Sequence, residues 1–404
     1  MLRVSAGPST SVMGGEIPRR RRAIYAALVS GFSLTSGFAL VETFALRREA
    51  HLEQLMVEPH GLELMRENPS GTGSYRLKPN LDLTTLVKGM RVRIRTNKFG
   101  MHWREVDPAR RQPTRRVAFV GDSFAFGCWA RDVEHSLVGV FESGLNRDRI
   151  EALNFGVGGY GLDDIELQLR EQVVDFSPDW IVVLLFTGND FRDTWLGPQK
   201  HRIEGGTAVL RREVLADRVP AAFLRAPYVS SPPAADPSPI RRGLEIFATF
   251  RLLLPAFGLD NPWVDFTVCR KFTSFSFWSQ VPPPDIALQA RDAALTTLTR
   301  MKAWTHESGA RLAVVAVPSR EQVYAQKETG RGYDVRLPQD WIHVWARESD
   351  VPYLDLWSRL REHAVATGED VYLPGDIHFS ERGHALAGVW IREWFASEVR
   401  PLGP

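Results

Sequence analysis

The apolar positions of the chain fall into short continuous runs, which are separated by longer stretches of helical spacing. The continuous runs cover 117–120, 150–153, 180–186, 312–317 and 352–356. Helical spacing of apolar residues covers 133–147, 162–176, 286–307, 339–348 and 380–397. Strands that alternate with helices of this length predict an α/β domain, with a parallel sheet covered by helices on both faces. We place this domain at 116–398.

One long segment, 192–285, interrupts the alternation. It contains the Pro/Ser/Ala-rich stretch SSPPAADPSP at 230–239 and the aromatic stretch FTSFSFWSQV at 272–281. A segment of this length between two strands of one sheet indicates an inserted cap or lid. Its aromatic side chains either line a substrate groove, touch a membrane surface or form the insertion's own small core.

A connecting region at 50–112 precedes the predicted domain and is rich in turn-forming residues. Within it, the stretch RVRIRT at 91–96 alternates strictly between arginine and β-branched residues. This period of two predicts a half-buried strand. Its arginine face is either a solvated edge that discourages pairing between sheets or a surface that grips an anionic glycan or lipid headgroup.

The stretch from Ala23 to Val41 carries no charge over 19 residues. That length suits a transmembrane helix, and the four arginines at 19–22 favour an N-terminus in the cytoplasm. We therefore expect a basic cytoplasmic tail at 1–22, a single anchor at 23–41 in the inner membrane, and a body on the periplasmic side. A cleaved signal peptide and a soluble helix are the alternatives.

Composition and charge narrow the function classes. The chain has 404 residues, of which 44% are hydrophobic and 24% are charged, as in a globular protein. Five arginines and Glu16 give residues 1–22 a net charge of +4, so the rest carries −2 of the total +2. The body therefore lacks the basic surplus of a nucleic-acid-binding protein. Cys128 and Cys269 lack the spacing of zinc ligands, and we expect both to be free, with a single disulfide between them as the alternative in an oxidising compartment.

Polar or glycine-rich corners follow the predicted strands where ligands bind in open parallel sheets, beyond the carboxyl ends. These corners hold Ser123 after the first strand, NFGVGGYG at 154–161 after the second, TGND at 187–190 after the third, and GDIHFSERGH at 375–384 near the C-terminus. Each has an ordinary structural explanation: Ser123 as a helix cap, TGND as a turn, Asp376 as a loop-closing side chain and His378 as a structural histidine.

Taken together, the corners predict a nucleophilic site. A serine hydroxyl needs an adjacent base, for which His378 is the candidate, and Asp376 would hold the imidazole in the right tautomer. The backbone amides of Ser123 and of a glycine in the 156–161 run, with the side-chain amide of Asn189, would form an oxyanion hole. We interpret His384 as structural. No metal or organic cofactor is expected.

The order of these four segments resembles that of the SGNH/GDSL hydrolase family. GDSF at 121–124 is similar to its first block, with Ser123 as the nucleophile. Alignment of NFGVGGYG on Asn154 puts Gly159 at the functional glycine of the second block, and TGND supplies Asn189. The last segment supplies Asp376 and His378, although only Ile377 separates them where two residues are usual.

This resemblance implies a three-layer α/β/α, flavodoxin-like fold and ester hydrolysis through an acyl-serine intermediate. Family substrates include lipids, small esters and O-acetylated sugars, and the anchor is similar to that of membrane-bound bacterial members. The first hypothesis is therefore a membrane-anchored serine esterase acting on an acyl or O-acetyl ester. An O-acyltransferase that uses the same triad on a glycan is the second hypothesis, and a non-catalytic binding or assembly protein is the third.

Overall fold

The computed structural model describes residues 36–44, 47, 63–71, 74–87, 90–109, 114–146, 149–198, 200–211 and 274–399. The predicted tail, most of the predicted anchor, residues 212–273 of the predicted insertion, and Cys269 lie outside this part. Residues 36–44 are helical. Within the described residues, no helix combines the length and the apolar character that a bilayer crossing requires.

The centre of the fold is a five-stranded parallel sheet with the strand order β13-β10-β7-β5-β6. Its strands are β5 (Arg115–Gly121), β6 (Ile150–Asn154), β7 (Trp180–Phe186), β10 (Arg311–Val317) and β13 (Tyr353–Asp355). All five match the apolar runs, so the predicted parallel sheet is confirmed. Every residue of β7 is buried, as expected for a central strand covered on both faces.

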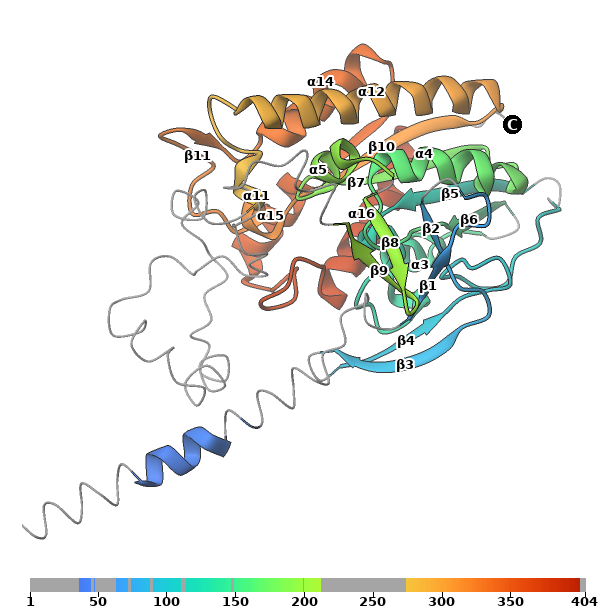
Figure 1. Ribbon diagram of the computed structural model, residues 1–404. Coiled ribbons are helices and arrows are strands. Elements are labelled where there is room, and N and C mark those ends of the chain that lie inside the picture. Colours follow the sequence, from blue (N-terminus) through green and yellow to red (C-terminus); the bar gives the residue numbers. More distant parts are fainter. Residues whose placement is uncertain are drawn as a thin grey trace, which may run out of the picture.

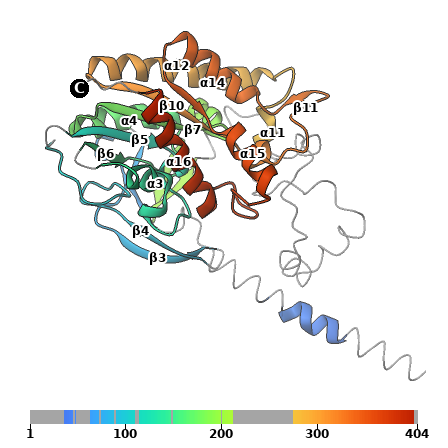
Figure 2. The same ribbon diagram turned by 180° about the vertical axis from the view of Figure 1, so that it is seen from behind.

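Helices cover both faces of the sheet (Figures 1 and 2), with α4, α12 and α14 on one side and α3 and α16 on the other. The longer helices are α3 (Leu137–Ser143), α4 (Leu162–Glu171), α5 (Asp190–Leu196), α12 (Asp285–Glu307), α14 (Leu337–Glu348), α15 (Trp357–Thr367) and α16 (Glu381–Ser397). In α12 the buried residues recur every three or four positions, which places one stripe against the core.

Two predicted helices are shorter than their periodic stretches. The stretch at 133–147 divides into the 3₁₀ turn η2 (Val133–His135) and α3, because the Ser136 side chain accepts a hydrogen bond from the Gly139 amide and caps a new helix. The stretch at 162–176 likewise ends as the 3₁₀ turn η3 (Val173–Phe176). Helix α5 runs past the predicted start of the insertion and packs against α12.

Shorter elements surround the sheet. Antiparallel hairpins pair β1 (Met65–Glu67) with β2 (Tyr75–Leu77), β3 (Asp82–Val87) with β4 (Met90–Arg95), β8 (His201–Glu204) with β9 (Thr207–Leu210), and β11 (Thr329–Gly330) with β12 (Tyr333–Asp334). The short helices are α2 (Ser123–Phe126), α11 (Ser274–Phe277) and α13 (Arg320–Val323).

The strand predicted at 91–96 corresponds to β4. Its residues Val92 and Ile94 are buried, and the arginines between them are turned outward. Two of these arginines contact acidic groups of this chain: Arg93 forms two hydrogen bonds with Asp82, and Arg95 an ion pair with Glu134. The arginine face is therefore partly neutralised within the fold.

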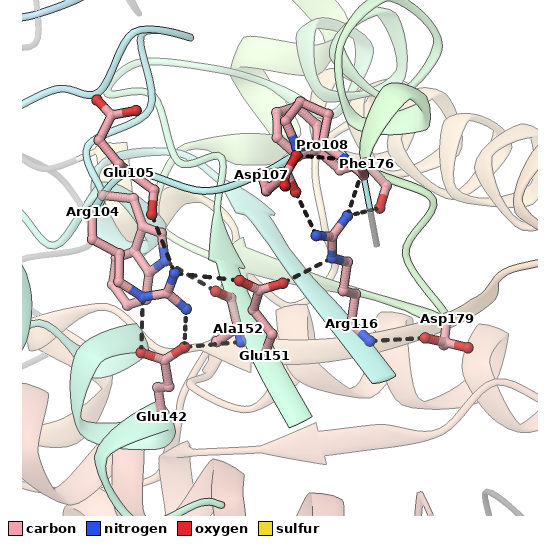
Figure 3. A network of polar contacts seen from close by, with 12 residues as sticks. Arg104, Glu105, Asp107, Pro108, Arg116, Glu142, Glu151, Ala152, Phe176 and Asp179 are labelled. Atoms are coloured by element: carbon pink, nitrogen blue, oxygen red, sulfur yellow. Dashed lines mark hydrogen bonds and ion pairs between the residues drawn. The ribbon is translucent and has the colours of Figure 1, made fainter. Parts of the chain in front are cut away.

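A buried ion-pair network occupies the amino ends of β5 and β6 (Figure 3). Arg116 is 2% exposed, and its Nε donates to Glu151 at 2.8 Å. Its Nη1 donates to the carbonyls of Pro108 and Phe176 at 2.8 and 2.9 Å. Glu151 also contacts Arg104. This network joins the lead-in segment to the sheet at the end opposite the strand termini that carry the candidate chemistry.

Candidate active site

The nucleophile candidate stands where β5 ends. Gly121 is needed there because a Cβ atom would lie 2.8 Å from the carbonyl oxygen of Leu184 on the neighbouring strand. Asp122 follows, fully buried, and its carboxylate accepts a hydrogen bond from the Phe124 amide at 2.9 Å. This cap starts α2, so Ser123 occupies the first position of the helix.

The structure brings Ser123, His378 and Asp376 together in one line. His378 Nε2 lies 2.9 Å from Ser123 Oγ, and His378 Nδ1 lies 2.7 Å from Asp376 Oδ1. A carboxylate only accepts hydrogen bonds, so Nδ1 carries the proton. In the neutral imidazole, Nε2 is then free to accept the serine proton. The distances suit proton transfer from the hydroxyl to the ring.

The charge state of His378 is set by its neighbours. Burial lowers the pKa of His378, but the hydrogen bond to Asp376 and the charge of that carboxylate act in the opposite direction and raise it. Burial also raises the pKa of the Cys128 thiol, so this thiol is uncharged at neutral pH. Asp376 therefore remains the charged group that favours the imidazolium, as an acyl-transfer triad requires.

The glycine run after β6 lies beside the nucleophile. A Cβ atom on Gly158 would be 3.9 Å from Ser123 Cβ, so this backbone passes close to the hydroxyl-bearing residue. Gly159 has a left-handed φ of 81°, and a Cβ atom there would be 2.7 Å from the Tyr75 hydroxyl. Tyr75 donates to the Gly158 carbonyl at 2.6 Å. The role predicted for the Gly159 amide stays a prediction.

Asn189 lies in the loop after β7, at the start of α5. Its side chain is 7% exposed, and among the described residues its Oδ1 has no hydrogen-bond partner. Trp278 Nε1 donates to the carbonyl of Gly188 at 3.0 Å and fixes this loop. Trp278, from the predicted aromatic stretch, is itself buried, so this side chain packs in the core. The donor role of Asn189 stays a prediction.

Two buried aspartates flank the candidate triad. Burial raises the pKa of Asp122 to about 6, against lowering contacts from the Phe124 amide and His378. Burial and the nearby Asp122 raise the pKa of Asp190 well above its usual value. Asp190 accepts a hydrogen bond from the Phe186 amide at 2.8 Å, so it holds the loop that carries Asn189.

The interpretation of His384 as structural fits its environment, because its Nε2 donates to the Cys128 carbonyl at 3.0 Å and burial lowers its pKa to about 4.

Sequence reasoning missed two contacts at the site. The contacts of Tyr75 with Gly158 and of Trp129 with Asp376 had no local signal, because 83 and 247 residues separate the partners. Within the described residues, no group of three or more potential metal ligands occurs.

A scan against models of protein families finds no match, and neither does a search of curated proteins. Among solved structures, a lipolytic protein of the G-D-S-L family from Desulfitobacterium hafniense is 13% identical, with 70% of this chain and 99% of that chain covered and a TM-score of 0.37.

Further matches are esterases. A variant of an acetyl-xylooligosaccharide esterase from Geobacillus stearothermophilus is 14% identical, covering 71% of this chain and 97% of that chain with a TM-score of 0.38. A two-domain esterase active on acetylated mannans is 12% identical, covering 72% and 52%, also at 0.38. The matched structures thus include the family that the four motifs resemble. Because their TM-scores are low, the functional proposal rests on the site's own geometry.

Proposed function

We propose that the chain is a serine esterase that hydrolyses an acyl ester through an acyl-enzyme on Ser123. The observation that carries this proposal is the continuous line of hydrogen bonds from Ser123 Oγ to His378 Nε2 at 2.9 Å and from His378 Nδ1 to Asp376 at 2.7 Å. A serine that only caps a helix does not require an imidazole nitrogen within hydrogen-bond distance of its hydroxyl. The line supplies both the base and the group that orients it.

In the first half-reaction, Ser123 Oγ attacks the ester carbonyl carbon while its proton passes to His378 Nε2. The carbonyl oxygen becomes an oxyanion, which the amides of Ser123 and Gly159 and the side chain of Asn189 would stabilise. When the carbonyl re-forms, the bond to the alcohol oxygen breaks, and the alcohol leaves with the proton from Nε2. The acyl group remains on Oγ.

In the second half-reaction, water attacks the acyl-serine and gives its proton to His378 Nε2. The same proton returns to Ser123 Oγ when the carboxylic acid leaves, so the enzyme is regenerated. Throughout, the Asp376 carboxylate stays ionised and stabilises the imidazolium. The proposed steps need no redox partner.

For the substrate, we propose an O-acylated glycan or lipid, with O-acetyl as the first acyl group to test. A sugar hydroxyl bound near the acyl-serine would convert hydrolysis into O-acyl transfer, because water and the sugar hydroxyl attack the same acyl-serine. We further propose that the uncharged stretch at 23–41 holds the enzyme in the inner membrane with its site on the periplasmic side.

The proposal is tested with the purified full chain, p-nitrophenyl acetate and a fluorophosphonate probe. We expect covalent labelling of Ser123 and ester hydrolysis by the native chain. Ser123→Ala and His378→Ala should each reduce turnover by about a million-fold, to the background rate. Ser143→Ala is the matched control, because Ser143 lies on α3 and its hydroxyl only donates to the Val140 carbonyl.

Two results would overturn the proposal. The first is hydrolysis by Ser123→Ala at the native rate, which would remove the nucleophile. The second is a folded native chain that neither takes the probe nor hydrolyses the ester, which would favour a binding or assembly protein. Adding an acetylated glycan donor and a second glycan as acceptor separates the remaining alternatives: acyl groups that appear on the acceptor without net release of acetate indicate transfer.

A further inference from the structure

A tight turn over residues 127–130 follows helix α2, which carries Ser123. Gly127 closes the helix in a left-handed conformation, and the Cys128 amide donates back to the Ser123 carbonyl at 2.9 Å. The Ala130 amide donates to the Gly127 carbonyl at 3.1 Å. From α16, His384 Nε2 donates to the Cys128 carbonyl at 3.0 Å. These bonds hold the peptide between Cys128 and the next residue, Trp129, in a fixed position relative to Ser123.

Trp129 itself has a φ of 67°. Left-handed φ values are unfavourable for bulky side chains and persist only where the surroundings impose them. Among the described residues, Trp129 is the one aromatic residue with such a φ. Its indole is 6% exposed and packs edge-on to the His378 ring, with 6.0 Å between centroids and 86° between planes. The turn therefore places the buried indole of Trp129 against the triad.

The indole reaches the acid of the triad as well as the base. Trp129 Nε1 donates to Asp376 Oδ2 at 3.2 Å. The other oxygen, Oδ1, accepts from both the backbone amide and Nδ1 of His378, at 3.0 and 2.7 Å. Each carboxylate oxygen thus has its own donor. Because the terminal torsion of an aspartate is broad, donors on both oxygens are what fix the plane of the carboxylate.

We propose that Trp129 is a positioning residue that orients the Asp376 carboxylate toward His378. The inference rests on the proposed esterase function and deepens it. Only Ile377 separates the acid from the base, so Asp376 Oδ1 serves the turn as well as the imidazole. The indole N–H holds the second oxygen and favours the ionised carboxylate. It thereby keeps the tautomer of His378 in which Nε2 accepts the serine proton.

The test compares Trp129→Phe with Trp103→Phe in the full chain. Both tryptophans are almost fully buried, and both donate one hydrogen bond at about the same length, but Trp103 Nε1 donates to the Ala152 carbonyl, away from the triad. Phenylalanine keeps an aromatic ring and removes the N–H. We expect kcat for p-nitrophenyl acetate to fall about 10- to 100-fold in Trp129→Phe with KM unchanged, and to stay native in Trp103→Phe.

A double-mutant cycle shows whether Trp129 acts through Asp376. On an Asp376→Ala background, Trp129→Phe should cause no further loss of kcat, because the group it orients is gone. A purely structural role would instead lower kcat by the same factor on both backgrounds. Fluorophosphonate labelling of Ser123 in each folded variant shows that the nucleophile remains in place.

The outcomes are distinguishable. Native kcat in Trp129→Phe, or an equal loss of kcat on both backgrounds, overturns the positioning role and leaves the esterase proposal standing. Trp129→His restores a ring N–H donor: among folded variants, recovery of kcat by histidine relative to phenylalanine supports the role, and equal kcat overturns it. If Trp129→Phe does not fold, Trp129→His replaces it in the cycle with Asp376→Ala, where an equal change of kcat on both backgrounds overturns the role. A native chain without esterase activity overturns both proposals.

Discussion

Arg116 provides the sharpest test of what stabilises the fold independently of catalysis. Its guanidinium is buried at the amino end of β5 and donates to Glu151 and to the carbonyls of Pro108 and Phe176 (Figure 3). Arg116→Met keeps much of the side-chain volume but removes the donor to Glu151 Oε2 and to these carbonyls, so that Glu151 retains only its contact with Arg104. Removing one partner of a buried ion pair typically costs about 3–5 kcal/mol of unfolding free energy.

The matched control is the adjacent residue. Arg115 is 41% exposed and pairs with Asp179, so Arg115→Met should cost less than about 1 kcal/mol. For a domain of this size, about 1 kcal/mol corresponds to roughly 2–4 °C in Tm, so Arg116→Met should lower Tm by about 10 °C. Arg116→Lys should lie between the two, because it keeps the charge and loses the planar fork.

The assays are thermal unfolding followed by circular dichroism, and ester hydrolysis per molecule of folded protein at a temperature where every variant is folded. Since Ser123 lies beyond the opposite end of β5, kcat/KM of Arg116→Met should remain native at that temperature. A Tm for Arg116→Met within 2 °C of that for Arg115→Met would refute the stability reasoning. A loss of kcat/KM in the folded variant would refute the separation of network from site.

Further predictions concern the site and its charges. Asn189→Ala should lower kcat by about 100- to 1,000-fold without changing Tm, whereas retention of native kcat would remove this side chain from the oxyanion hole. Gly156→Ala should prevent stable folding, as judged by circular dichroism, because its Cβ would lie 2.0 Å from the Phe126 amide nitrogen. The kcat/KM profile should rise with pH through a pKa above about 6.5, because contacts raise the pKa of His378 and the protonated ring cannot act as base. Burial lowers the pKa of His102 to about 4, so the unfolded chain binds its proton first. His102→Gln should therefore gain stability relative to the native chain, by up to about 3 kcal/mol, as urea titrations move from pH 7 to pH 4. An unchanged difference between the two proteins would show that His102 does not titrate as its burial requires.

The parallel sheet could be predicted because its strands are buried on both faces and therefore read as unbroken apolar runs, such as the one within β7. The short hairpins had no such pattern: β1 and β2 are three residues long, and Tyr75 matters through a contact with Gly158 rather than through its neighbours. The sequence pattern did not predict helix α5, because its seven residues fall where the alternation of strands and helices gives way to the predicted insertion.

The candidate site likewise contains residues that the sequence predicts and contacts that only the structure shows. The identities of Ser123, Asp376 and His378 could be proposed from short motifs at strand ends. The hydrogen bond between Trp129 and Asp376 joins residues 247 positions apart, so no local pattern predicts it. The left-handed φ of Trp129 is equally invisible in sequence, because a bulky residue gives no sign of that conformation.

The short separation of Asp376 and His378 has a consequence for how the site assembles. Acid and base share one turn, where a single carboxylate oxygen accepts from the backbone and the ring of the same histidine, so this half of the triad is complete within three residues. The hydroxyl of Ser123 belongs to a residue 255 positions before His378 in the sequence. Completion of the triad thus depends on a single distance, from Ser123 Oγ to His378 Nε2, and a probe that spans this distance would report whether the two segments have docked into a complete triad.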